Sequence, residues 1–335
     1  MKGLVIGGGS IGKRHLANLK MLGVQQLALV EKDSARREGV AMELSVPAFS
    51  DIGEGLAWRP DFVVIATPTN LHLEQGSRVV REGFHLFLEK PLCHSAEGMA
   101  EFTALVETKK VVSMVGCNMR FHPGPTHVKR LLSEDRIGRV LFARVHAGSY
   151  LPEWRLSTDY RTNYAAREET GGGCILDCIH EIDLTRWYLG EVREVVCMAA
   201  HVSSLEIATE DVASMVCRHV SGAISEIHLD YVQRTYERGC QIVGEQGSIF
   251  WDFSKKQVRW FDGGTGQWTA LSQPDGWEVN QMYLDEMEHF INSVANGRPT
   301  ALTVPEAMAV MQIAFAAKTS ARQGRVAAAT SEVPA

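Results

Sequence analysis

The stretch MKGLVIGGGSIGKRHLANLKMLGVQQLALVE, residues 1–31, decides the fold of this chain. It reads as an apolar strand, a glycine-rich turn, an amphipathic helix, a second apolar strand and a terminal acid. Gly7 permits a tight turn, Gly9 lets the backbone approach a pyrophosphate, and Gly12 lets the helix pack closely on the strand. Glu31 lies nineteen residues after Gly12 (31 − 12), near the spacing at which an acid meets the ribose hydroxyls of a dinucleotide. The layout therefore predicts a dinucleotide site, with phosphate charge favoured by the amides and dipole of the helix that opens at Ser10 and Ile11.

Length and composition favour a globular protein of two domains. The chain has 335 residues, and 34 basic minus 40 acidic residues give a net charge of −6, so a nucleic-acid partner or an anionic membrane is not expected. No apolar run approaches the ~18 residues of a membrane span, and Met1 leads almost directly into a strand, so we expect no signal peptide. Seven cysteines without framework spacing predict reduced thiols in the cytoplasm.

Cysteines four residues apart raise the alternative of a metal site. Cys174 and Cys178 lie close to His180 in the sequence, a combination that zinc can use. Buried small hydrophobic thiols give the simpler interpretation, so we expect no metal.

The chain beyond Glu31 predicts two architectures in succession. Strands and helices alternate up to Val115, which is typical of a doubly wound parallel sheet. From Val195 to Phe261 the pattern becomes β-rich, with the alternation of half-exposed antiparallel strands, and helices are expected at Glu278–Val294 and Pro305–Arg322. We therefore predict an α/β Rossmann domain over residues 1–119 and an α+β domain over residues 120–335, whose largely antiparallel open sheet has helices on one face. The tail from Ala327 is expected to fray.

Lys90 is the first candidate catalytic residue. Glu89-Lys90-Pro91 follows the predicted strand Phe84–Leu88, so Lys90 should emerge at the carboxyl edge of the sheet, where open α/β sheets bind ligands. The alternative is a surface lysine in a turn.

His180 and Asp177 are the second candidates. A continuous helix is predicted from Cys174 to Leu189, and on it the two residues share a face. An acid beside an imidazole suits proton transfer, because histidine titrates near neutral pH. The alternative is an ion pair on a helix surface, without a role in chemistry.

These residues carry a resemblance to the Gfo/Idh/MocA family of NAD(P)-dependent sugar and cyclitol oxidoreductases. It rests on Gly7-x-Gly9-x-x-Gly12, Thr67-Pro68-Thr69-Asn70-Leu71-His72, Glu89-Lys90-Pro91, Asn118-Met119-Arg120-Phe121-His122-Pro123, and Gly171-Gly172-Gly173 through His180-Glu181-Ile182-Asp183 to Arg186-Trp187. The resemblance implies that Lys90 contacts the reacting oxygen and that His180 is the acid/base. Many family members place the acid four residues before the histidine, whereas Asp177 is three before His180, so Asp177 could orient a substrate hydroxyl or only the histidine.

A cofactor site and a reaction follow from the motifs and the resemblance together. The expected cofactor-binding residues are Gly7, Gly9, Ser10, Ile11, Gly12, Glu31, Thr67, Pro68, Asn70, His72, Glu89, Lys90 and Asn118. We expect hydride transfer between a carbinol carbon and nicotinamide C4, with His180 accepting the hydroxyl proton and Lys90 stabilising the alkoxide. Glu31 favours NAD, because its carboxylate repels a 2′-phosphate; Lys32, Arg36 and Arg37 keep NADP as an alternative.

Residues 149–170 should form the wall of a substrate pocket, because long loops in compact domains are usually functional. The expected substrate-binding residues are Lys90, Arg120, Tyr150, Trp154, Arg155, Tyr160, Arg161, Tyr164, Asp177 and His180. Aromatic faces beside charged groups suit a polyhydroxylated ring, and Arg155 or Arg161 could hold a carboxylate or phosphate. The segment resembles relatives near amino-sugar and nonulosonic-acid pathways, which implies a modified or nucleotide-linked sugar, with an inositol or a free aldose as the nearest alternative.

Two other functions and an assembly remain open at this point. One alternative is an NAD-sensing regulator without catalysis, and another is a reductase of a non-sugar carbonyl or imine. Open antiparallel sheets have one face left to bury, and Trp251, Trp260 and Trp268 are candidates for that contact. The resemblance implies a homodimer or homotetramer.

Overall fold

The computed structural model describes residues 1–154 and 159–329, and these form two compact units. The first contains Met1–Asn118 together with Glu278–Met308, and the second contains Met119–Trp277 together with Ala309–Ala335. The sequence placed a single boundary after residue 119 and did not anticipate the return of Glu278–Met308 to the first unit. That return is explained by Phe290, which is fully buried and packs edge-on against Phe62 and Phe87, with ring centroids 5.6 and 5.5 Å apart.

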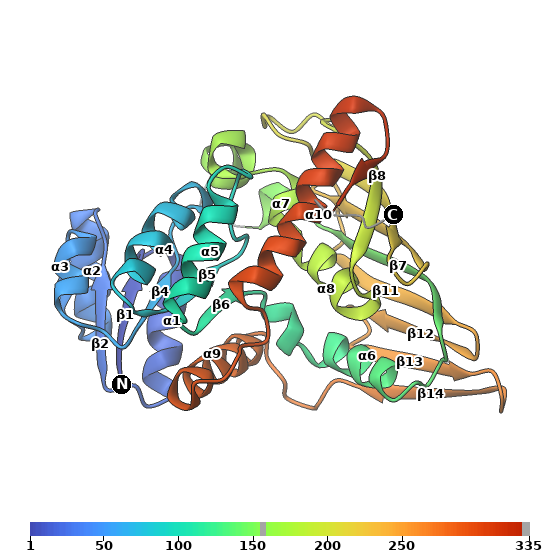
Figure 1. The fold of residues 1–335 in the computed structure, drawn as a ribbon, viewed down its shortest axis with the longest axis horizontal. Coiled ribbons are helices and arrows are strands. Elements are labelled where there is room, and N and C mark those ends of the chain that lie inside the picture. The colour runs from blue at the N-terminus through green and yellow to red at the C-terminus, as the bar shows by residue number, and fades with distance from the viewer. Residues whose placement is uncertain (155–158, 330–335) are drawn as a thin grey trace. The chain divides into compact units, whose positions relative to one another are not determined.

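The first unit is built around a six-stranded sheet in which every pair of neighbours is parallel. The strand order is β3-β2-β1-β4-β5-β6, and right-handed crossovers place α1 and α4 on opposite faces (Figure 1). α1 packs against α9, and α4 packs against α5. The elements are β1 Lys2–Ile6, α1 Ser10–Met21, β2 Gln26–Val30, α2 Ser34–Leu44, β3 Ala48–Phe49, α3 Ile52–Ala57, β4 Phe62–Ile65, η1 Thr69–Leu71, α4 His72–Arg81, β5 His85–Glu89, α5 Met99–Lys109, β6 Ser113–Gly116 and α9 Asn280–Asn296.

The second unit has a nine-stranded sheet in the order β14-β13-β12-β11-β7-β10-β9-β8-β15. Only the β7/β10 pair is parallel within the described residues, so the predicted largely antiparallel sheet is confirmed. Helices α6, α8 and α10 lie on one of its faces (Figure 1). The strands are β7 Val140–Gly148, β8 Val192–Ala200, β9 Val212–His219, β10 Ile224–Asp230, β11 Glu237–Gly244, β12 Gly247–Asp252, β13 Gln257–Asp262, β14 Gln267–Ser272 and β15 Ala327–Ala328; the helices are η2 Asn118–Phe121, α6 Pro123–Ser133, η3 Leu151–Glu153, η4 Tyr160–Thr162, η5 Tyr164–Ala166, η6 Glu168–Thr170, α7 Cys174–Asp177, α8 Ile179–Leu189 and α10 Val304–Gln323.

Strand β9 illustrates why one face of this sheet is covered and the other open. Ala213, Met215 and Cys217 are buried, whereas the residues between them, such as Ser214 and Val216, are exposed. Successive side chains point to opposite faces of a strand, so the buried set faces the helices. Alternation of the same kind in the sequence was the basis for predicting an open sheet.

The first residues of the tail predicted to fray form a strand instead, while residues 330–335 lie outside the described residues. Ala327 and Ala328 pair with Val195 and Glu194 as the short edge strand β15. Backbone pairing of this kind depends on the neighbouring strand β8 rather than on local side chains, so the composition of the tail did not reveal it.

None of the helices, as far as the chain is described, combines the length and the apolar character that crossing a bilayer requires.

His122 sits in an aromatic cage of the second unit. Its ring lies 4.7 Å from that of Trp277, 5.3 Å from Phe253 and 5.6 Å from Trp251, and 1% of the residue is exposed. Its Nδ1 accepts the Gly124 amide at the start of α6, at 3.0 Å. Burial, and then the charges of Arg238 and His127, lower the pKa of His122 from 6.5 to about 4.

We expect His122 to make the protein less stable in mild acid. Below pH 6.5 the unfolded chain takes up a proton that the folded state refuses until about pH 4, so the free energy of unfolding falls as the pH drops through this window. The lost stability should approach about 3 kcal/mol at the acid end. Urea unfolding of the wild type and His122→Asn between these limits tests this, because asparagine preserves a capping acceptor without titrating. Equal pH slopes for the two proteins would contradict it.

Candidate active site

The glycine turn of the first unit has the shape that a dinucleotide needs. Gly7 has a φ of +100°, and a Cβ on it would lie 2.6 Å from the Ala66 carbonyl oxygen. A Cβ on Gly12 would lie 1.8 Å from the Gly7 carbonyl oxygen, whereas one on Gly9 would meet nothing within 4 Å. α1 starts without a side-chain cap and without an acid in its first turn. Its opening amides and dipole therefore face an open space that suits a pyrophosphate.

Glu31, just after β2, is fixed by the same turn. One carboxylate oxygen accepts the Gly8 amide at 2.8 Å, and the other accepts the Asp33 amide at 2.9 Å. The Arg36 guanidinium lies 3.3 Å from the carboxylate, and the residue is 8% exposed. The acid predicted to meet the ribose is thus held in a fixed orientation beside the turn, and these residues fit a dinucleotide with free ribose hydroxyls.

The loops after β4 and β5 form the carboxyl edge of the sheet. Pro68 and Asn70 are exposed there, and Thr67 is half-buried. His72 is 1% exposed, and its ring lies between the carbonyl oxygens of Thr67 and Pro91, each 2.9 Å from a ring nitrogen. Burial lowers the pKa of His72. His72 therefore ties the two loops together, and its place beside the cofactor, which the resemblance implied, stays a prediction.

The remaining candidates of the first unit also lie at this edge. Glu89 is the last residue of β5, and Lys90 follows it; both are half-buried. Asn118, which follows β6, is 6% exposed and begins η2. Lys90 thus lies at the carboxyl edge of the sheet, where the sequence predicted it.

The predicted helix from Cys174 to Leu189 is two helices. α7 ends at Asp177, Cys178 has a φ of −87° and a ψ of 35°, and α8 begins at Ile179. Asp177 and His180 therefore lie on either side of a break, and the prediction that they share one helical face is wrong. Both are buried, with 4% and 8% exposed, so the alternative of a surface ion pair is also wrong.

Asp177 is held by two tyrosine hydroxyls. Tyr164 donates to one carboxylate oxygen at 2.9 Å, and Tyr231, which follows β10, donates to the other at 3.3 Å. The ring of Trp154 packs edge-on against Tyr231 at 5.2 Å, and Trp154 is 36% exposed. The second unit thus links Trp154, Tyr164 and Asp177 through Tyr231, and their role in binding a substrate stays a prediction. Sequence reasoning missed Tyr231, although an aromatic residue at the end of an alternating strand was a signal for it.

The two acids of His-Glu-Ile-Asp anchor α8. Asp183 is fully buried and accepts two bonds from Arg120, at 2.9 and 2.7 Å. Glu181 forms a buried ion pair with Arg238 at 2.8 Å. The guanidinium of Arg120 also lies over the Trp187 ring. Arg120 therefore holds α8 through Asp183, and its predicted contact with a substrate stays a prediction. Arg238, unremarkable in sequence, was missed.

The remaining candidates of the 149–170 segment have other partners. Arg161 donates to Asp159 and to Glu206 on the surface, and the Tyr160 hydroxyl accepts the Glu206 amide at 3.3 Å. Arg161 is thus committed to two acids, so we do not assign it to a substrate carboxylate. Tyr150 lies under the guanidinium of Arg234, 3.6 Å from its ring centroid. Arg155 lies outside the described residues.

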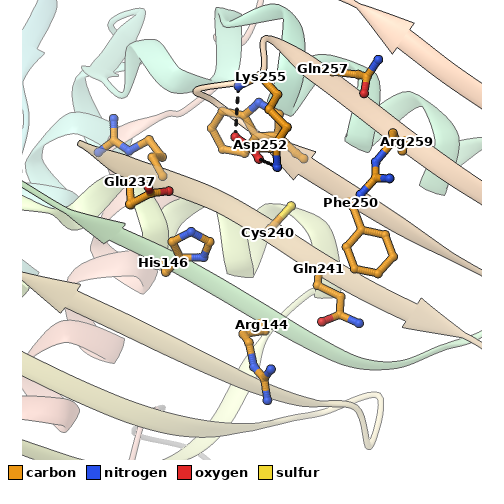
Figure 2. A pocket seen from close by; sticks show the side chains of 12 residues that line it. Arg144, His146, Glu237, Cys240, Gln241, Phe250, Asp252, Lys255, Gln257 and Arg259 are labelled. Atoms are coloured by element: carbon orange, nitrogen blue, oxygen red, sulfur yellow. Dashed lines mark hydrogen bonds and ion pairs between the residues drawn. The ribbon is translucent and has the colours of Figure 1, made fainter. Parts of the chain in front are cut away.

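Two hollows occur on the open face of the second sheet. One, of about 290 Å³, lies over β7, β11, β12 and β13, and Figure 2 shows Arg144, His146 and Phe250 on its wall. The other, of about 590 Å³, extends over β7 to β8 and shares Arg144 and His146. Neither lining contains Asp177 or His180. Of the three tryptophans proposed for a contact here, Trp251 is buried at 3% and Trp260 donates to the Arg136 carbonyl, whereas Trp268 is 52% exposed.

The cysteines are buried single thiols. All seven are free, and burial raises the pKa of Cys93, Cys197, Cys217 and Cys240 to about 12. Over residues 1–154 and 159–329, no group of three histidine, cysteine or acidic side chains is placed to hold a metal ion.

A Rossmann unit with a glycine turn, an acid after β2 and a lysine after β5 is typical of a dinucleotide-dependent oxidoreductase. Residues 1–117 match the model of an oxidoreductase family with an NAD-binding Rossmann fold, and residues 126–250 match the GFO/IDH/MocA C-terminal domain. The chain belongs to the Gfo/Idh/MocA family, and its nucleotide cofactor is NAD.

Relatives extend over the whole chain. It is 26% identical to scyllo-inositol 2-dehydrogenase (NAD(+)) of Bacillus subtilis (strain 168), over 96% of this chain and 94% of that one. It is 28% identical to myo-inositol 2-dehydrogenase of Thermotoga maritima, over 96% of both chains. A solved structure of levoglucosan dehydrogenase with NADH superposes with a TM-score of 0.90 at 20% identity, covering 98% and 99% of the two chains; at this identity the likeness establishes the fold alone.

Proposed function

We propose that the chain is an NAD-dependent dehydrogenase that oxidises a secondary hydroxyl of a cyclitol or sugar. The observation that carries this proposal is the second unit's buried Asp177, held by Tyr164 and Tyr231 three residues before His180. An acid fixed in this way suits hydrogen bonding to a hydroxyl of a polyol. Two full-length relatives named for inositol oxidation support the substrate class.

Two residues of the chain have separate roles in the reaction: one accepts a proton, and the other stabilises negative charge. His180 accepts the proton of the reacting hydroxyl, and the Lys90 ammonium stabilises the alkoxide charge that develops as the C–H bond breaks. NAD, held by the glycine turn and Glu31, would supply the hydride acceptor, nicotinamide C4, when bound. Asp177 orients a hydroxyl of the ring or the imidazole of His180, and the two tyrosines keep its carboxylate from turning. In the reductive direction His180 returns the proton.

Aromatic faces favour a ring substrate over an apolar carbonyl. Trp154 is partly exposed beside Tyr231, so a sugar ring could lie on its face while polar groups bind the hydroxyls. The sequence suggested a modified or nucleotide-linked sugar as the substrate, and that remains the more specific form of this proposal. A free inositol or an anhydro-sugar is the simpler substrate.

A substrate panel tests the proposal. The purified protein is assayed for NADH formation with scyllo-inositol, myo-inositol, levoglucosan, D-apiose and a nucleotide-linked hexose, beside a His180→Asn variant. We expect turnover of at least one polyol and its loss in the variant. Tight NAD binding without turnover of any member would favour the NAD-sensing regulator, and turnover of only a non-sugar carbonyl or imine would favour that reductase.

We propose that a second copy of this chain covers the open face of the sheet. This face exposes Met198 (84%), Val196 (43%) and Val216 (40%), and its charges are already matched in the pairs Arg144–Glu226 and Arg218–Glu194. An apolar surface with balanced charge suits self-association. Sedimentation velocity should show a dimer or larger species, and a monomer throughout the accessible concentration range would contradict this.

A further inference from the structure

Glu89, the residue before Lys90, is held from the side of α1. His15 is fully buried on α1, and its Nε2 lies 2.5 Å from Oε1 of Glu89. The other oxygen of Glu89 accepts the backbone amide of Lys90 at 3.3 Å. One carboxylate therefore connects α1 to the backbone of the candidate catalytic lysine.

The contacts of His15 fix its tautomer. Its ring packs edge-on against Phe87 at 5.2 Å and against Tyr283 at 6.4 Å. Its Nδ1 is buried and has no hydrogen-bond partner among the described residues. A buried lone pair without a donor is better tolerated than a buried N–H without an acceptor, so we assign the ring proton to Nε2, which donates it to Glu89.

A second carboxyl group lies behind this pair. Glu286 of α9 is fully buried, and within the described chain neither of its oxygens has a hydrogen-bond partner. It lies between Tyr283 and Phe290 on the helix face that meets His15 and Phe87. Ionised, such a carboxyl would cost several kcal/mol of desolvation. Burial, and then the nearby Glu89, raise the pKa of Glu286 well above its usual value.

The other groups that face this space carry positive charge or none. Arg14 of α1 lies over the Tyr283 ring at 4.5 Å, and Lys90 is near enough to Tyr283 to affect its phenol. Arg14 and Lys90 are thus the cations near Tyr283, and Glu89 and Glu286 are the two carboxyl groups of this cluster.

We propose that His15 is a positioning residue, which orients Glu89 and through it Lys90, and that Glu286 stays protonated so that Glu89 is the one carboxylate of this cluster. The role of Lys90 here rests on the proposed function. Misplacing a charged group by about 1 Å can cost about 100-fold in rate. Loss of the hydrogen bond from His15 to Glu89, the residue before Lys90, should therefore lower the rate measurably.

The positioning role is tested with His15→Leu and His15→Gln. We expect His15→Leu to lower kcat by about 10- to 100-fold, with KM for the polyol and Kd for NADH within about 2-fold of wild type. Glutamine can donate an amide hydrogen to Glu89, so His15→Gln should recover most of kcat. Wild-type kcat in His15→Leu, or an equal loss in both variants, would overturn the positioning role. If His15→Leu does not fold, His15→Gln is compared with Asn18→Gln, a control on the same helix. A kcat that is lower in His15→Gln than in this control, at wild-type KM, would contradict the positioning role.

The protonation state of Glu286 is tested by a measurement that does not depend on enzyme activity. ¹³C NMR of protein labelled at the glutamate carboxyl carbon, with Glu286→Gln used to assign the signal, should place Glu286 at the shift of a protonated acid at neutral pH. A chemical shift typical of a carboxylate would overturn the proposed protonation of Glu286. His15→Leu should also move the Glu89 signal. If no polyol is turned over, the proposed function is contradicted. The NMR signals still report the protonation state of Glu286 and the contact between His15 and Glu89.

Discussion

Replacing Lys90 by methionine is expected to lower kcat by about 100- to 1,000-fold, with Kd for NADH within about 2-fold of wild type. Methionine preserves most of the apolar stem and removes the ammonium, so the loss reports charge instead of packing. The carboxyl end of β5 places Lys90 beside the loop after β4, at the edge where an NAD-binding sheet receives its ligand. Steady-state kinetics with a substrate found in the panel, and fluorescence titration with NADH, are the two measurements.

A control variant and a double variant sharpen this test. Lys109→Met removes an exposed lysine at the end of α5 and should leave kcat unchanged. Lys90→Met combined with His180→Asn should lose less than the sum of the two single effects if both residues act in one step. Full turnover in Lys90→Met would remove Lys90 from the mechanism, and strict additivity would place the two residues in separate steps.

Replacing Asp183 by alanine is expected to cost about 3–5 kcal/mol of unfolding free energy. Asp183 is fully buried and receives both hydrogen bonds from Arg120, which is itself 7% exposed. Without Asp183, the Arg120 guanidinium stays buried without its acid, and the desolvation of the cation is no longer offset. Urea unfolding monitored by tryptophan fluorescence measures the change.

An exposed ion pair on the sheet of the same unit provides the control. Glu194 accepts from Arg218 at 2.7 Å, and the two side chains are 38% and 49% exposed. Glu194→Ala should cost less than about 1 kcal/mol. The double variant Arg120→Met, Asp183→Leu should recover much of the stability, because it removes both charges together. A loss in Asp183→Ala no larger than that in Glu194→Ala would contradict this account of the buried pair.

Local patterns predicted the first unit well. The spacing of Gly7, Gly9 and Gly12 is dictated by backbone contacts within one turn, so it can be recognised without knowing the fold. Glu31 was found in the same way, because it lies at the end of the next strand. Lys90 followed from its place after a strand whose burial on both faces makes it apolar.

Features that depend on distant partners could not be predicted. Arg120 pairs with Asp183, which lies sixty-three positions away, and no spacing in the sequence reveals that pair. The ends of β10 and η5 bring Tyr231 and Tyr164 to Asp177, and no periodicity in any one segment records that meeting. The break at Cys178 was missed because the apolar spacing of Ile175, Ile179 and Ile182 continues through it.

The return of Glu278–Met308 to the first unit has a consequence for how the molecule comes into being. α9 supplies Phe290 to the core that Phe62 and Phe87 begin, and it reaches the ribosome exit only after the whole of the second sheet up to β14. The N-terminal part must therefore wait, with this apolar surface uncovered, while nearly half of the chain is translated. A cofactor-binding fragment cut after residue 118 would carry the same exposed surface permanently, so the nucleotide-binding half is first in sequence but cannot be the first half completed.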